Sequence, residues 1–124
     1  MKFREHLEDI DFDGAEVVDV ARKDDVVIVY FRKGILLPSH PAHSRFSGTL
    51  DSYEISFFGL KNEEALKYVG VGESVAYLGK IPVESLEHII HEDDQFTFGG
   101  YVEREPWYEW RFNANEYEVR LGNS

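Results

Sequence analysis

The sequence contains no cysteine, which excludes disulfide bonds, a thiolate nucleophile and any zinc or iron–sulfur site built on cysteine. It also has no apolar run near the roughly 18 residues of a membrane-spanning helix, and residues 26–31 form its longest one. The first residues carry no apolar stretch of signal-peptide length. We therefore expect a cytoplasmic protein that does not associate with membranes.

Basic residues are scarce, because 13 Lys and Arg stand against 24 Asp and Glu and the net charge is −11. Up to Asn62 there are 11 acidic and 8 basic residues (net −3), and after it there are 13 and 5 (net −8). Binding to nucleic acids or anionic membranes requires basic patches, so we expect neither partner. The acidic surplus either serves solubility or attracts a basic protein partner.

The length of 124 residues suits one acidic β-rich domain spanning residues 1–124. Aromatic residues are abundant, with nine Phe, seven Tyr and two Trp, whereas a disordered chain is poor in them. A hydrophobic fraction of 43% is sufficient for a packed core without a stabilising metal.

Apolar and polar residues alternate along much of the chain, which is typical of strands with one buried face. Three hairpins are predicted, from the segments 15–21 with 26–32, 45–50 with 53–60, and 108–112 with 117–121. Further strands are expected at 74–78 and 95–103, and the apolar strand 26–31 should be covered on both faces.

Helical spacing of apolar residues predicts short helices over 2–9, 63–69 and 82–91, the second capped by Asn62. The predicted fold class is mainly β, as an antiparallel sandwich or partly open barrel of about seven to nine strands with two or three short peripheral helices. The alternative is an α+β fold with helices on one face of an antiparallel sheet.

Four of the five histidines fall in two His-x-x-His pairs, His40 with His43 and His88 with His91. On the helix expected over 82–91, His88 and His91 would lie on nearly the same side and could share a divalent metal ion with a nearby carboxylate. The loop 38–43, which contains two prolines and is expected to be exposed, would complete the site with His40 and His43. The competing interpretation is a solvated helix face without metal.

An acidic run in the second half of the chain contains no lysine or arginine. Such a run can steer a basic partner towards the protein, or it can be a solvated surface. Trp107 follows Pro106 and is expected to be exposed, where it would anchor a partner. The predicted partner-binding residues are Glu84, Glu87, Glu92, Asp93, Asp94 and Trp107.

Six aromatic residues gather between positions 101 and 117, and they form either a core layer or a stacking surface for a ligand. No phosphate-binding loop, nucleophile elbow or catalytic triad is recognisable, so no catalytic residue is predicted and a non-enzymatic protein is favoured.

Three functions remain open from the sequence. The first is a non-enzymatic acidic domain that binds a protein partner, of the immunity, antitoxin or regulatory kind. The second is a small-molecule or metal-binding β-barrel whose pocket uses the two His-x-x-His pairs. The third is a structural subunit that forms a homodimer through an exposed edge strand near Trp107.

Overall fold

A computed structural model describes residues 1–77 and 79–122 of the chain. In these residues, eleven strands join into one antiparallel sheet, accompanied by a 3₁₀ turn (η1, Leu7–Asp9) and a four-residue helix (α1, His43–Phe46). No helix in the described part of the chain is long and apolar enough to cross a membrane. The strands are β1 (Lys2–Phe3), β2 (Ile10–Asp11), β3 (Glu16–Lys23), β4 (Val26–Leu36), β5 (Thr49–Phe58), β6 (Lys61–Gly70), β7 (Glu73–Ala76), β8 (Ser85–Glu92), β9 (Gln95–Tyr101), β10 (Tyr108–Asn113) and β11 (Glu116–Leu121).

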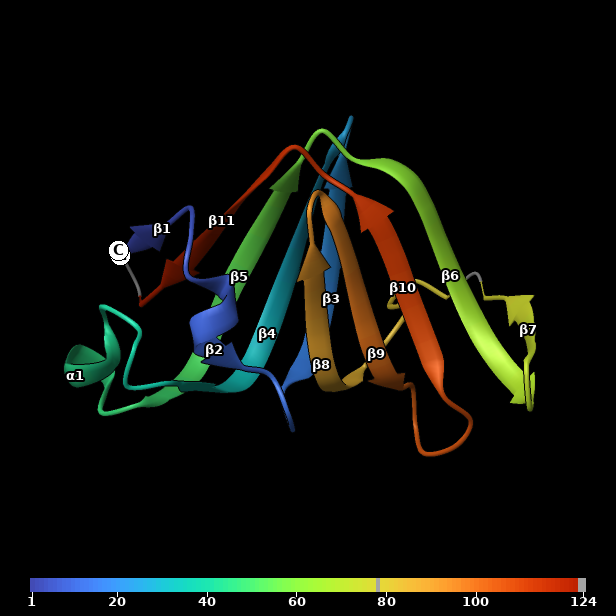
Figure 1. The fold of residues 1–124 in the computed structure, drawn as a ribbon, viewed down its shortest axis with the longest axis horizontal. Helices are drawn as coiled ribbons and strands as arrows, with labels where there is room; N and C mark the ends of the chain where they lie inside the picture. Colours follow the sequence, from blue (N-terminus) through green and yellow to red (C-terminus); the bar gives the residue numbers. More distant parts are fainter. Residues whose placement is uncertain (78, 123–124) are drawn as a thin grey trace.

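The sheet runs in the order β1-β11-β5-β4-β3-β8-β9-β10-β6-β7, and the short β2 pairs with β4 outside this path. Where β3 meets β8, the strand ladder has a single residue pair, Glu16 with Ser85. The sheet curls, so that Phe57 of β5 lies 4.9 Å, between ring centroids, from both Phe96 of β9 and Phe112 of β10. Figure 1 shows the two halves leaning towards each other while the outer strands β1 and β7 stay far apart.

The concave inner face of this sheet holds the core, and aromatic side chains dominate it. On β10, Tyr108, Trp110 and Phe112 are buried, while Glu109 and Arg111 between them lie on the outer face. The mainly β, antiparallel class predicted from this alternation is confirmed. The largest fully buried side chains are Trp110, Phe31, Phe57, Phe96, Phe98 and Phe112.

The arrangement differs from the prediction in its details. The described residues form eleven strands rather than seven to nine, and all of them belong to one open sheet. Strand β4 is not covered on both faces, because Val27 and Val29 are fully buried whereas Ile28 and Tyr30 remain partly exposed.

The helix predicted for residues 82–91 is wrong, because residues 85–92 form β8, which pairs with β9. A β-bulge adds Glu87 between Leu86 and His88. Leu86 and Ile89 therefore both pack against the core although they are three residues apart. A bulged strand has thus reproduced the apolar spacing of a helix.

The two other predicted helices are also wrong over most of their length. Residues 63–69 belong to β6, which is hydrogen-bonded to β10 on one side and β7 on the other. Asn62 does not cap a helix, since its side chain donates a hydrogen bond to Asn113 Oδ1. Of residues 2–9, two form β1 and three form η1. Pairing with neighbouring strands outweighs the small differences in local propensity.

One of the three predicted hairpins is confirmed, that of β3 and β4. Residues 49–58 instead form the single strand β5 between β4 and β11. Strands β10 and β11 are consecutive but do not pair, because β10 lies between β9 and β6 and β11 between β5 and β1. Alternation indicates which face of a strand is buried, and it carries no information on the neighbouring strand.

Candidate functional site

His88 and His91 point to opposite faces of β8. His91 stacks on Phe96 at 4.1 Å between ring centroids and meets Tyr117 edge-on. His88 lies on the outer face, with its ring 5.5 Å from that of Trp107. Side chains alternate between the faces of a strand, so a three-residue spacing separates the two imidazoles. The structure does not bring this pair together, and the reason for expecting a shared metal ion disappears with the helix.

The loop that carries His40 and His43 is folded against the protein rather than exposed along its length. His40 is only 3% exposed, and its Nδ1 accepts a hydrogen bond of 3.0 Å from the backbone N–H of Ala42. His43 begins α1 and lies half-buried next to Gly48. The ring of His40 lies 5.7 Å from that of His6, a histidine that the sequence analysis did not select.

The acidic run lies on the hairpin of β8 and β9, and we name residues 84–95 the acidic hairpin. Glu87, Glu92 and Asp93 are exposed, and none of them takes part in the ion pairs formed among the described residues. Asp94 is also exposed and accepts a hydrogen bond of 2.9 Å from Asn113 Nδ2. Three exposed carboxylates with no ion-pair partner among the described residues therefore lie along one hairpin.

Glu84 differs from the other acidic residues because it is partly buried. Its backbone N–H donates to the carbonyl of Tyr101, and its own carbonyl accepts from the N–H of Val17. Glu84 thus joins the start of β8 to both neighbouring strands, a structural role for its main chain.

Trp107 is half-buried in a small aromatic patch on the outer face, with ring centroids 5.5 Å from His88 and 5.4 Å from Tyr101. Its Nε1 donates a hydrogen bond of 3.3 Å to Glu109. Gly99 lies beneath the patch, where a Cβ atom would come within 2.5 Å of His88 Nε2 and 2.6 Å of the Trp107 ring. The missing side chain at this position lets both rings lie over β9.

The outer face next to this patch is acidic as well. Its cation Arg111 lies 3.3 Å from Glu64 and 3.9 Å from Glu109, so its charge is neutralised within the face. Tyr68 donates a hydrogen bond of 2.8 Å to Glu109, which raises the pKa of the Tyr68 hydroxyl. A depression of about 260 Å³ crosses β8, β9 and β10, lined by Ile90, Glu92, Gln95, Thr97, Glu109 and Arg111.

Most of the C-terminal aromatic cluster belongs to the core. Tyr108, Trp110, Phe112 and Tyr117 are buried. Only Tyr101 and Trp107 of the six face outward and remain partly exposed. A surface on which ligands stack is therefore reduced to the patch around Trp107.

The sequence analysis did not single out His6, Glu8 and Asp9, which gather in space. Their ligand atoms lie within 4.8 Å of one another, and no other trio of histidine, cysteine or acidic side chains is so close in the described part of the chain. The signal was present, since three metal-ligating residue types occur within four positions. It was hidden by the helix expected over residues 2–9, whose polar side they would have formed.

A second group that the sequence analysis missed joins β3 to β6. The Arg22 guanidinium donates two hydrogen bonds of 2.6 Å to Glu63, and Trp110 Nε1 donates a third of 2.7 Å. Burial alone would raise the pKa of Glu63, but these hydrogen bonds outweigh it and lower the pKa. A cavity of about 430 Å³ borders the group and is also lined by Tyr77 and Pro82. Along the chain, Glu63 lies 41 positions from Arg22 and 47 positions from Trp110, so no local sequence pattern indicates these contacts.

Comparison with known proteins adds no further information about the site. No protein-family model, no curated protein and no solved structure matches this chain. The functional argument therefore rests on the charge, exposure and geometry of the residues described above.

Proposed function

We propose that the protein is a non-enzymatic binding domain whose acidic hairpin docks a basic protein partner. One observation carries the proposal: Glu87, Glu92 and Asp93 are exposed on one hairpin and form no ion pair among the described residues. Exposed negative charges along one surface attract a cationic partner. The protein would itself be of the immunity, antitoxin or regulatory kind, and the location of the protein in the cytoplasm stays a prediction.

The chemistry of the neighbouring face defines the partner further. Ile90 is 44% exposed, and His88, two residues earlier on the same outer face of β8, carries the ring contact with Trp107. An apolar or aromatic centre with a charged rim is a common design of protein interfaces. We therefore propose a partner surface with lysine or arginine side chains around at least one apolar side chain.

Charge reversal on the hairpin tests this proposal. A variant with Glu87→Lys, Glu92→Lys and Asp93→Lys should lose the basic proteins that the wild type captures from a cell lysate at low salt. The wild-type captures should themselves weaken steeply with salt, because screening shortens the reach of exposed charges to about 8 Å at physiological ionic strength.

The matched control reverses three exposed acidic residues elsewhere, Glu5→Lys, Asp51→Lys and Glu73→Lys. It changes the net charge by the same amount, so it separates a local site from a general effect of charge. Equal capture by the wild type and the hairpin variant, or equal loss in both variants, would refute the hairpin as the binding site.

A homodimer is the second candidate, and β7 favours it, because this strand lies at an edge of the sheet and pairs only with β6 among the described residues. The sequence predicted an edge strand near Trp107. Strand β10 next to Trp107 is not at an edge, because it pairs with β9 and β6. All four residues of β7 are exposed, and Val75 is 48% exposed. Light scattering after size exclusion should then show a dimer that Val75→Lys dissociates, whereas a monomer at all concentrations would remove this candidate.

A further inference from the structure

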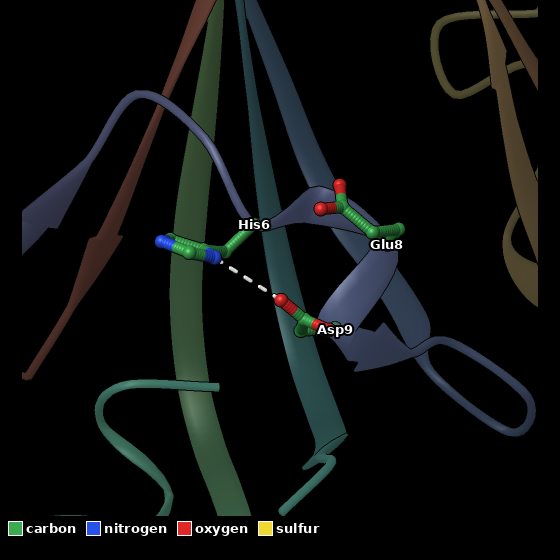
Figure 2. A group of neighbouring side chains, drawn as sticks. All are labelled: His6, Glu8 and Asp9. Carbon is green, nitrogen blue, oxygen red and sulfur yellow. Dashed lines mark hydrogen bonds and ion pairs between the residues drawn. The ribbon is translucent and has the colours of Figure 1, made fainter. Parts of the chain in front are cut away.

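The side chains of His6, Glu8 and Asp9 surround one small volume at the end of the sheet near β1. Figure 2 shows the three side chains converging, with the dashed line joining His6 Nδ1 to Asp9 Oδ2 at 3.1 Å. All three ligand atoms lie within 4.8 Å of one another. Ligands at the usual zinc distances of about 2.0–2.2 Å stand roughly 3–3.5 Å apart. The spacing of 3.1 Å between His6 and Asp9 already lies in this range, and the Glu8 carboxylate lies within 4.8 Å of both. We propose that His6, Glu8 and Asp9 bind a Zn²⁺ ion.

The backbone that carries these ligands is anchored on both sides. Leu7, between the first two ligands, is buried, and its N–H donates a hydrogen bond of 3.0 Å to the hydroxyl of Tyr117 on β11. The carbonyl of Asp9 accepts a hydrogen bond of 2.9 Å from the N–H of Leu37. Contacts to two distant parts of the chain therefore hold η1, and an ion binding there would need little rearrangement of the backbone.

A partner outside the group orients the Asp9 carboxylate. Ser39 Oγ donates a hydrogen bond of 2.6 Å to Asp9 Oδ1, so that the other oxygen, Oδ2, is the one that meets His6. This hydrogen bond is the main reason why the pKa of Asp9 is lowered, and it keeps the carboxylate in the charged form that binds metal. Ser39 is thus a positioning residue, the kind of partner on which ligand geometry commonly depends.

An independent observation points to the same place. Two buried side-chain nitrogens lack a hydrogen-bond partner within the described residues, and one of them, His40 Nε2, belongs to the ring packed against His6. Because His40 Nδ1 accepts from Ala42, the neutral ring carries its proton on Nε2. His40 is therefore a donor in need of an acceptor rather than a ligand, and it brings no positive charge to the ion. A water molecule or anion bound near the ion is the kind of acceptor that would satisfy it.

The ligand chemistry selects among divalent ions. One imidazole nitrogen with two carboxylates suits Zn²⁺, while Mn²⁺ binds the same ligand types less tightly. Ca²⁺ and Mg²⁺ prefer six or more oxygen ligands, including backbone carbonyls and water. Zn²⁺ should therefore bind, and Ca²⁺ at the same concentration should not.

Calorimetric titration of the full chain with zinc chloride tests the assignment. We expect one ion per chain in the wild type, and affinity reduced more than about tenfold by His6→Ala and by Asp9→Asn. Ser39→Ala should weaken binding about 10–100-fold, the range found for residues that orient metal ligands. His88→Ala, a histidine on the outer face of β8, is the matched control and should bind like the wild type.

Chemical-shift mapping of the wild type keeps the test independent of whether the variants fold. Added Zn²⁺ should perturb the amide signals of residues 5–10 and 39–40. The assignment is refuted by the absence of heat up to millimolar zinc, by shifts centred on His88 or His91, or by undiminished binding in a folded His6→Ala variant. None of these results bears on the acidic hairpin, so the two proposals stand or fall separately.

Discussion

Arg22 and Glu63 meet through two parallel hydrogen bonds of 2.6 Å, and Trp110 donates a third hydrogen bond to the same carboxylate. The guanidinium also lies 5.7 Å from the centre of a Trp110 ring. Charged hydrogen bonds with this forked geometry are the stronger kind, even where the side chains are partly exposed. This contact links the end of β3 to the start of β6, two strands that are not neighbours in the sheet.

Replacing Glu63 should therefore destabilise the fold. We expect Glu63→Gln to lower the free energy of unfolding by about 1–2 kcal/mol at neutral pH, because charged hydrogen bonds are lost and solvent screens part of the effect. Urea denaturation measures the difference. Glu64→Gln is the matched control, since Glu64 is more exposed and makes a longer ion pair of 3.3 Å.

The same contact should depend on pH. The pKa of Glu63 is below its ordinary value of 4.5 in the folded protein, so the unfolded chain binds the proton more readily. The stabilisation is present above pH 4.5 and is lost as the pH falls through the lower folded value. The difference in stability between wild type and Glu63→Gln should therefore shrink in acid, and a difference that grows there would contradict this account.

The two neighbouring glycines of β9 should respond differently to a methyl group. A Cβ at Gly99 meets the movable ends of His88 and Trp107, whereas one at Gly100 collides with the backbone carbonyl of Ser85. We expect Gly99→Ala to change the tryptophan fluorescence with little loss of stability, and Gly100→Ala to cost about 3 kcal/mol. Thermal unfolding of both variants makes the comparison, and equal losses would show that the Ser85 contact can relax.

Tyr117→Phe should affect both stability and zinc binding. Removing the hydroxyl leaves the buried N–H of Leu7 without an acceptor, at a cost of about 1–3 kcal/mol. Because Leu7 lies between His6 and Glu8, the zinc affinity should fall as well. Urea denaturation and calorimetry measure the two effects. Tyr101→Phe, on the outer face, serves as the control and should leave zinc affinity unchanged.

His40 should make the protein less stable in mild acid. Burial, reinforced by the neighbouring His6, lowers the pKa of His40 below its ordinary value of 6.5. The unfolded chain then binds more protons than the folded one, so stability decreases as the pH falls below about 6.5. Denaturant midpoints between pH 8 and pH 5 should show this decline, and a His40→Gln variant with the same decline would exclude His40 as its source.

Much of the β character of the fold could be predicted because each strand carries its own pattern. Residues 108–112 and 117–121 alternate strictly, and both segments are strands with one buried face. The order of the strands could not be predicted, since a buried face does not identify its neighbour. The strand β8 could not be predicted, because the bulge at Glu87 gives its apolar residues the spacing of a helix.

For the candidate sites too, features with a local sequence pattern could be predicted and features that depend on distant contacts could not. The acidic hairpin could be predicted from the sequence, because its acidic residues lie near one another along the chain. They share one element whether that element is a helix or a strand. The grouping of His6 with Glu8 and Asp9 depends on η1, and its partners Ser39 and Tyr117 lie far along the chain. The pair of His88 and His91 was selected for a helical geometry that residues 85–92 do not adopt.

The bulge at Glu87 makes the pairing of β8 with β9 as important as the composition of β8. If the residues of β8 paired one to one with β9, without the bulge, every side chain from His88 to the turn would exchange sides, so that the imidazole of His88 would enter the aromatic interior. The extra residue therefore sets the phase of the strand, and its deletion should leave His88 opposite Gly99 and the sides of the later residues unchanged.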